Sequence, residues 1–187
     1  IDKKYKDDSF TISYIGSLSN SAIDISFVKK FVNLLNKKDI GYKMIIAGEG
    51  PLAEEILHLE KNNKNINFVG IVSEEKVTNI LKKTSLMLAP YPKSETFEKS
   101  IPNKIQMSLA YGIPILTTLN GSTKKIIEKY NLGLYTKSEK KAIKFIQKLK
   151  SSQSLKKIIF ENCRLVYKEE FNHSKNYDML SNYIFNL

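Results

Sequence analysis

The residues best suited to chemistry follow predicted strands, and two closely spaced glycines are the first of them. Gly48 and Gly50 lie between a β-branched run and a helical pattern. Glycines let a backbone approach a phosphate closely, and the start of a helix offers N–H groups without an intrahelical acceptor. The third glycine of a dinucleotide-binding turn is missing, so the same residues also fit a tight turn that binds no ligand. The sequence leaves both interpretations open.

A second candidate is the pair Asn103 and Lys104, which follows Pro102. Proline is favoured at the start of a helix because its fixed φ suits the first turn. An ammonium group and a short amide beside the positive end of that helix would form a suitable cradle for a diphosphate. The alternative is a solvated lysine, one of 30 basic residues in the chain.

Carboxylates in the polar segment 90–100 form a third candidate. Glu95 and Glu98 could accept hydrogen bonds from sugar hydroxyl groups, although carboxylates in loops are usually only solvated. Metal and thiol chemistry have little support in the sequence. His58 and His173 have no second ligand at metal-binding spacing, and Cys163 is the only cysteine. We therefore expect neither a metal ion nor a cofactor.

Length and composition predict one packed domain with an anionic partner. The chain has 187 residues, of which 42% are hydrophobic and 26% charged. Its net charge of +11 favours a nucleotide, an anionic lipid surface or a nucleic acid. Nucleic acid is the least supported of the three, because no stacking motif or recognition helix is present. No apolar run reaches the roughly 18 residues of a membrane span.

The elements that must position these candidates follow a βαβ pattern, in which short β-branched runs alternate with longer stretches of helical period. Strands are predicted at residues 10–15, 42–47, 65–69, 86–89, 113–117 and 133–135. Right-handed crossovers would place helices on both faces of a parallel sheet. The prediction is an α/β fold with a doubly wound, Rossmann-like parallel sheet of about six strands.

Residues 10–187 are predicted to form this domain, and residues 1–9 a polar linker from a missing N-terminal domain. The first residues carry neither a signal pattern nor an initiator Met. Helices are predicted to begin at Pro51 and to span residues 101–110, whereas segment 90–100 is predicted to be irregular. Residues 139–187 are predicted to be C-terminal helices, in three pieces broken near Ser151 and Asn172.

Doubly wound sheets bind ligands at the carboxyl ends of their strands. That edge should gather Gly16, Gly48, Gly70, segment 90–100 and the pair Thr117-Thr118. A ligand site at this edge therefore follows from the topology alone.

Residues 139–170 carry nine basic and four acidic side chains. One face of the first predicted helix in this region is apolar, and lysines occupy most of the rest. The apolar face consists of Ala142, Phe145, Ile146 and Leu149. This pattern is typical of helices that lie on anionic membranes, and equally of helices whose apolar stripe packs on a core.

Four motifs in chain order resemble those of one known family. They are Tyr14–Ser19 followed by Ile23-Asp24, Ile46–Leu52, Asn65–Gly70, and Ser100–Ile105 continuing through Leu109–Ile115. The last is the most specific, because it resembles the family's S-x-P-x-K and A-x-G-x-P signatures. Their order and spacing make residues 10–186 similar to the C-terminal, donor-binding domain of GT-B glycosyltransferases of family 4, also called glycosyl transferases group 1.

The resemblance implies a two-domain parent enzyme that moves a sugar from a nucleoside diphosphate sugar to an acceptor. This chain would be the second half, would bind a donor at best by itself, and would have the N-terminal domain as its partner. The donor-binding positions that it implies are Gly16, Ser17, Gly48, Gly50, Gly70, Ile71, Tyr91, Glu95, Thr96, Asn103, Lys104 and Met107. Lys104 and Asn103 would stabilise the leaving diphosphate. Glu95 and Thr96 would orient the sugar.

We further expect a role in cell-surface polysaccharide or glycolipid synthesis. The protein would be cytoplasmic and peripheral on the inner face of the membrane, because a basic surface suits a lipid-linked acceptor.

Three positions depart from the family pattern. The family usually has an Arg and a Lys in the loop after the first strand, where this chain has Ser17 and Ala22. A Glu that typically bonds the donor ribose is replaced by Met107. Each lost charge-assisted hydrogen bond costs roughly one to two powers of ten in affinity. These departures leave two interpretations open: a divergent enzyme, and a non-catalytic binding or scaffold module of the same fold.

Overall fold

The six predicted strands form one parallel sheet. The computed structural model describes residues 10–171, so the predicted linker and the helical piece beyond Asn172 lie outside the described residues. The strands are β1 Thr11–Ile15, β2 Lys43–Ala47, β3 Ile66–Gly70, β4 Leu86–Ala89, β5 Ile115–Thr117 and β6 Gly133–Tyr135. Every neighbouring pair is parallel, in the spatial order β3-β2-β1-β4-β5-β6. The predicted doubly wound α/β fold is confirmed.

The direction in which the sheet grows reverses between β1 and β4. Strands β2 and β3 extend it on one side of β1, whereas β4, β5 and β6 extend it on the other. Right-handed crossovers therefore place the helices of the two halves on opposite faces. The carboxyl ends of β1 and β4 form the topological switch point, where sheets of this order bind ligands.

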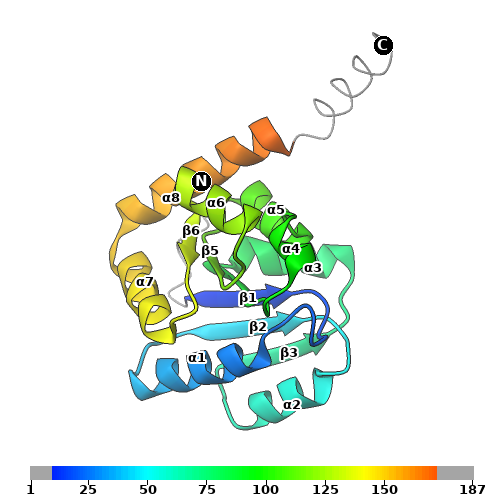
Figure 1. Cartoon of the computed structure of the whole chain (residues 1–187). Coiled ribbons are helices and arrows are strands. Elements are labelled where there is room, and N and C mark those ends of the chain that lie inside the picture. Colours follow the sequence, from blue (N-terminus) through cyan, green and yellow to red (C-terminus); the bar gives the residue numbers. More distant parts are fainter. Residues whose placement is uncertain (1–9, 172–187) are drawn as a thin grey trace, which may run out of the picture.

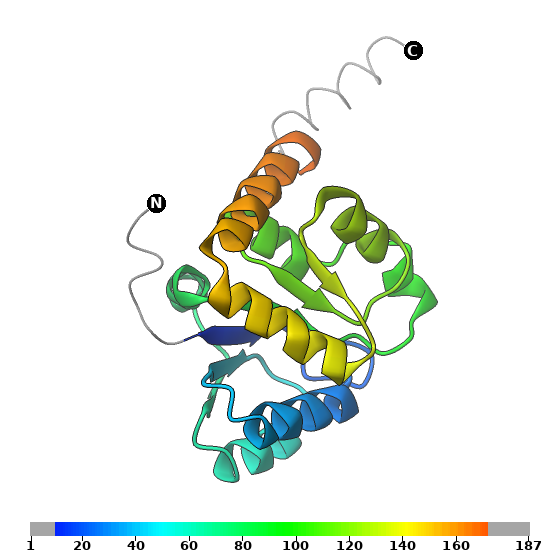
Figure 2. The same cartoon turned by 90° about the vertical axis from the view of Figure 1, so that its left-hand side faces the viewer.

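The helices cover both faces of the sheet. They are α1 Ile25–Lys37, α2 Ala53–Lys61, α3 Glu74–Lys83, α4 Glu95–Glu98, α5 Asn103–Tyr111, α6 Ser122–Tyr130, α7 Glu139–Ser151 and α8 Gln153–Glu170. Helices α1 and α7 lie side by side on one face, and α5 packs against α8 on the other (Figures 1 and 2). Phe27, Phe31 and Leu35 recur along α1 at helical spacing and are buried in the core.

Helix α8 closes the far end of α5. Gly112 ends α5 with a φ of 66°, and a Cβ at this position would lie 2.3 Å from the Phe160 ring of α8. The Arg164 guanidinium donates to the Ala110 carbonyl, and the neighbouring Cys163 of α8 is fully buried. The orientation of α5 is therefore set from its C-terminal end as well as by the sheet.

Strand β5 begins at Ile115, two residues later than predicted, and the helices differ from the prediction in three places. Helix α2 begins at Ala53 instead of Pro51, since Pro51 and Leu52 form a turn whose Leu52 N–H donates to the Leu18 carbonyl of the neighbouring loop. Helix α5 begins at Asn103 instead of Ile101, since a residue before proline is kept out of the helical region. Within the segment that was predicted to be irregular, Glu95–Glu98 form the short helix α4, which the Ser94 side chain caps.

Helix α7 settles the question that its amphipathic pattern left open. Ala142, Ile146 and Leu149 are buried in the main core, and Phe145 packs against it. The apolar stripe therefore packs on the core, which is the second of the two interpretations of this helix. The lysines on its opposite face are exposed. Between residues 10 and 171, no helix has both the length and the hydropathy of a membrane span.

Candidate functional site

Lys104 lies at the switch point and is the least expected side chain there. Only 6% of its surface is exposed, although it belongs to the first turn of α5. Its Nζ atom is buried and has no hydrogen-bond partner among residues 10–171. No described carboxylate forms an ion pair with it. The alternative of a solvated lysine is therefore wrong.

Two tyrosines surround the Lys104 ammonium. Nζ lies 4.0 Å from the centroid of the Tyr14 ring and 4.5 Å from that of the Tyr91 ring. Both distances are within the range of cation–π attraction. Tyr14 comes from the end of β1 and Tyr91 from the segment after β4, so the two strands at the switch point each supply one ring.

Burial controls the protonation of this cluster. It lowers the pKa of Lys104 from 10.5 to about 7, because the charged ammonium is removed from water without a counter-ion. Burial also raises the pKa of both tyrosine hydroxyls, which stay neutral across the physiological range. An anion that entered next to Nζ would supply the missing charge and favour the protonated lysine.

Gly16 leaves room for the lysine at the end of β1. A Cβ at this position would lie 3.2 Å from Lys104 Cε and 3.3 Å from Nζ. The φ of Gly16 is 147°, a value that residues with a side chain rarely adopt. The glycine therefore keeps one side of the ammonium next to bare backbone.

Local hydrogen bonds fix the elements that hold the cluster. Ser108 Oγ donates to the Lys104 carbonyl within α5, at 2.7 Å. Thr117 Oγ1 donates to the Ala89 carbonyl at 2.7 Å, and Thr118 Oγ1 to the Tyr91 carbonyl at 2.6 Å. The segment after β4 is thus pinned to the end of β5, and the Tyr91 ring also packs on Phe97, with 4.9 Å between centroids.

The glycines after β2 have a structural reason that involves no ligand. A Cβ on Gly48 would lie 1.9 Å from the Gly16 carbonyl oxygen, and one on Gly50 would lie 2.5 Å from that of Leu18. The Leu18 N–H also donates to the Glu49 carbonyl at 2.7 Å. The tight packing of the two loops therefore accounts for both glycines. The Gly48 N–H donates to the Gly70 carbonyl at 2.8 Å and so joins the loop after β3 to this edge.

The remaining predicted residues lie around this cluster with less defined contacts. Ser17, Glu95, Thr96 and Asn103 are exposed, and so is Ile71, at 70%. Met107 is half-buried and packs against a small apolar cluster of Leu81, Met87 and Ile113, one turn along α5 from Lys104. The structure thus brings Gly16, Tyr91 and Lys104 into one cluster, whereas Met107 packs into apolar surroundings.

Tyr14 is absent from the donor-binding positions predicted from the sequence. A signal for it was present, because alternation along β1 places Tyr14 on the core side beside Ile12, one residue from the carboxyl end. A buried tyrosine needs a partner for its hydroxyl, and at that position the partner must come from the adjoining loop.

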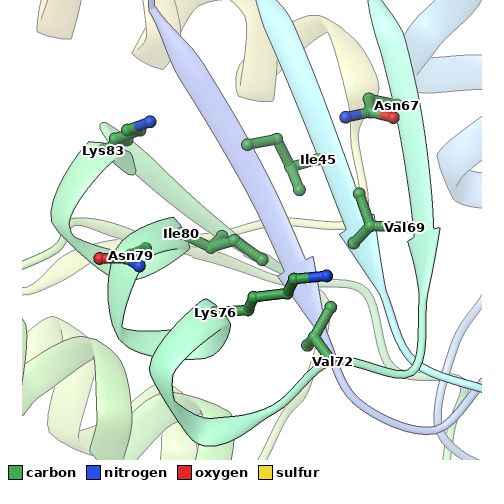
Figure 3. A pocket seen from close by; sticks show the side chains of 8 residues that line it. All are labelled: Ile45, Asn67, Val69, Val72, Lys76, Asn79, Ile80 and Lys83. Carbon is green, nitrogen blue, oxygen red and sulfur yellow. The ribbon is translucent and has the colours of Figure 1, made fainter.

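Several hollows lie outside the Lys104 cluster. One, of about 200 Å³, adjoins Tyr91 and is lined by Asp24 and Glu139 with three lysines, Lys30, Lys93 and Lys137. Another, of about 240 Å³, lies on the sheet: Lys76 and Ile80 of α3 face Ile45 and Val69 across it (Figure 3). Within residues 10–171, no three His, Cys, Asp or Glu side chains come together in an arrangement that could hold a metal ion.

Comparison with known proteins places this geometry in a family context. The family described as "Glycosyl transferases group 1" matches residues 9–152. An uncharacterised glycosyltransferase of Methanocaldococcus jannaschii is 28% identical over an alignment of 182 residues, and the match covers 93% of this chain and 45% of that protein. The chain therefore spans less than half the length of this relative.

Solved structures of low sequence identity share the fold. The Anabaena protein HepE, solved in complex with UDP-glucose, has a TM-score of 0.76 at 14% identity, over 96% of this chain and 49% of that one. The C-terminal domain of LpcC, a glycosyl transferase group 1 family protein of Francisella tularensis, has a TM-score of 0.69 at 15% identity, over 88% and 87% of the two chains.

Proposed function

The chain belongs to the glycosyl transferases group 1 family, and on that premise we propose that it is the donor half of a glycosyltransferase, which binds the diphosphate of a nucleotide sugar at Lys104. The observation that carries this proposal is the buried Lys104 ammonium without a partner, at the switch point of the sheet. A diphosphate bound there would be the counter-ion that the protein itself does not supply.

The chemistry assigned to the site is stabilisation of a leaving group. As the bond between the sugar and the diphosphate breaks, negative charge grows on the diphosphate oxygens. A desolvated ammonium stabilises that charge more strongly than a solvated one would. The first N–H groups of α5, which have no intrahelical acceptor, add hydrogen-bond donors on the same side. Glu95 and Thr96 are proposed to orient the sugar.

The other half of the reaction is proposed to lie outside this chain. Because the chain spans 45% of its archaeal relative and 49% of HepE, an N-terminal domain of the parent protein is the proposed partner and the proposed site of the acceptor. The chain alone is then expected to bind a donor without transferring its sugar.

A second function is supported by the three departures from the family pattern. Ser17 is exposed, Ala22 is buried, and Met107 packs into an apolar cluster, so none of these side chains can offer the charge-assisted bonds of the usual Arg, Lys and Glu. The alternative is a non-catalytic binding or scaffold module that has kept the fold.

A thermal-shift screen separates the two functions. The 187-residue chain is heated with UDP, UDP-glucose, GDP, ADP or CMP at millimolar concentration and low salt. The screen is run at pH 6.5, where most Lys104 side chains are protonated. Saturation at about 100 times the dissociation constant stabilises a protein by roughly 2.7 kcal/mol, which is several degrees for a domain of this size. UDP and UDP-glucose come first, because HepE was solved with UDP-glucose.

A shift with one diphosphate supports the donor half and identifies its base. No shift with any ligand, in a sample that unfolds cooperatively, contradicts donor binding and favours the scaffold module.

A role in cell-surface polysaccharide or glycolipid synthesis, at the inner face of the membrane, is also proposed. The support is the exposed basic face of α7, with Lys140, Lys141 and Lys144. Each lysine near an anionic surface contributes about 1 kcal/mol of attraction. Changing all three to Gln should therefore weaken sedimentation with phosphatidylglycerol vesicles at least about tenfold. Equal binding of both proteins, or equal binding to phosphatidylcholine vesicles, would contradict this location.

A further inference from the structure

Tyr14 contacts both parts of the candidate donor site, helix α5 and the loop after β1. Its ring faces the Lys104 ammonium, with Nζ 4.0 Å from the centroid. Its hydroxyl donates to the Ser17 carbonyl at 2.5 Å and lies 3.4 Å from the Ala22 carbonyl. Ring and hydroxyl thus act on two different elements, helix α5 and the loop after β1.

We propose that Tyr14 is a positioning residue of the donor site, which holds the Lys104 ammonium with its ring and the loop after β1 with its hydroxyl, ready for a diphosphate. This inference rests on the proposed function, since it specifies how that same site is prepared for its ligand.

The ring is suited to hold a charge that has no anion beside it. The face of an aromatic ring carries partial negative charge, and it attracts a cation more strongly when water is excluded. Tyr14 is only 1% exposed and Lys104 only 6%, so little water screens the pair. The other titratable group against Nζ is Tyr91, whose hydroxyl is neutral. The two rings stabilise the ammonium without neutralising it, so its charge stays available to an incoming anion.

The Tyr14 hydroxyl contacts the backbone carbonyls of two uncharged loop residues, Ser17 and Ala22. Ser17 and Ala22 stand where the family resemblance places an Arg and a Lys, and here only their backbone groups can serve. The single Tyr14 hydroxyl proton goes to the Ser17 carbonyl, and the Ala22 carbonyl lies 3.4 Å from the same oxygen, so the tyrosine holds the start of the loop at the end of β1 and packs against its far side. A fixed loop presents its N–H groups to a ligand without an ordering cost at the moment of binding.

Two substitutions test the contributions of the Tyr14 ring and the Tyr14 hydroxyl separately, and neither opens a cavity. Tyr14→Phe removes the hydroxyl and keeps the ring, and 3,4,5-trifluorophenylalanine at position 14 keeps the shape while fluorine withdraws the negative charge from the ring face. Tyr42 is the matched control, because it is also buried and donates its hydroxyl to Asn36 Oδ1 at 3.0 Å, before β2 at the opposite end of the strands.

The first measurement needs no ligand. Titration of Lys104 is followed by NMR of lysine labelled at Cε. The midpoint should stay the same in Tyr14→Phe and fall by about half a pH unit when trifluorophenylalanine replaces it, because the ring no longer favours the charged form. The same two changes at position 42 should leave the Lys104 titration where it is.

The second measurement is diphosphate affinity at pH 6.5 by calorimetry, with the best ligand of the screen. Tyr14→Phe should weaken binding about threefold to tenfold through the loosened loop, and Tyr42→Phe should not. An unchanged Lys104 midpoint with the fluorinated ring overturns the proposal for Tyr14, as does unchanged affinity in Tyr14→Phe. A shifted midpoint in a protein that binds no diphosphate overturns the proposed function and leaves the contact between ring and ammonium standing.

Discussion

Replacing Lys104 by methionine is expected to stabilise the protein while removing its affinity for a diphosphate. Methionine has the length of the lysine stem and no charge, so it can fill the space between Tyr14 and Tyr91 without the desolvation cost. The pKa of Lys104 is lowered from 10.5 to about 7, which corresponds to an upper limit of about 4 kcal/mol on the free energy of unfolding gained at pH 7.

The stability that Lys104→Met gains over wild type should decrease as the pH rises. Between pH 7 and 10.5 the unfolded chain binds more protons at position 104 than the folded chain, because the folded pKa is the lower one. Wild-type stability therefore rises with pH across this window. The difference between Lys104→Met and wild type should shrink by about 2 kcal/mol from pH 7 to pH 9.

Urea unfolding at pH 7, 8 and 9 measures this difference. The exposed Lys82 of α3 gives the control, since Lys82→Met removes one lysine without touching the site. Diphosphate binding at pH 6.5 completes the test: Lys104→Met should lose at least about tenfold in affinity, the effect of one charge-assisted hydrogen bond. A variant that is less stable than wild type and binds the diphosphate equally well would refute both the buried ammonium and its role.

The second large effect is expected for Gly48→Ala. A Cβ at this position would lie 1.9 Å from the Gly16 carbonyl oxygen, and φ is 142°. The Gly16 oxygen belongs to the backbone and cannot turn away as the end of a flexible side chain could. The loops after β1 and β2 would therefore have to separate. Whether the backbone moves or stays strained, the free energy of unfolding of Gly48→Ala should fall by roughly 3 kcal/mol or more, which is a large part of the stability of a domain.

Gly70→Ala is the matched control at the same edge. Gly70 has a φ of 62°, but a Cβ there would meet nothing within 4 Å. Only the conformational cost of a left-handed residue remains, about 1 kcal/mol. Urea midpoints of the two variants should therefore differ clearly. Equal losses of stability would mean that the contact between the loops after β1 and β2 is not tight in solution.

Much of the fold follows from the pattern of the chain because it is encoded locally. The alternation of β-branched runs with helical periods predicts the six strands, and the handedness of crossovers predicts helices on both faces. The start of α2 could not be predicted, because the Leu52 N–H is taken by Leu18, a residue of another loop. The orientation of α7 was equally hidden, since amphipathicity does not say what covers the apolar face.

The sequence predicts where the candidate site lies, but it does not predict that Lys104 is buried there. Topology places Gly16, Gly48, Gly70 and segment 90–100 at one edge. Burial of Lys104 depends on Tyr14 and Tyr91, which are distant from it in the sequence and approach it only when β1, β4 and α5 are assembled. Nothing in the local pattern distinguishes this lysine from the other basic residues. The contacts of Glu95, Thr96, Asn103 and Met107 with a donor stay predictions.

The position of α8 determines where the C-terminal boundary of an expressed fragment can lie. The match to the family ends at residue 152, immediately before α8 begins at Gln153. Yet Ile159, Cys163 and Val166 of α8 belong to the main core, and Phe160 closes the end of α5 at Gly112. A protein fragment that ended at residue 152 would lack α8, which packs against α5, the helix that carries Lys104. A fragment intended for donor-binding studies therefore has to extend at least through Glu170.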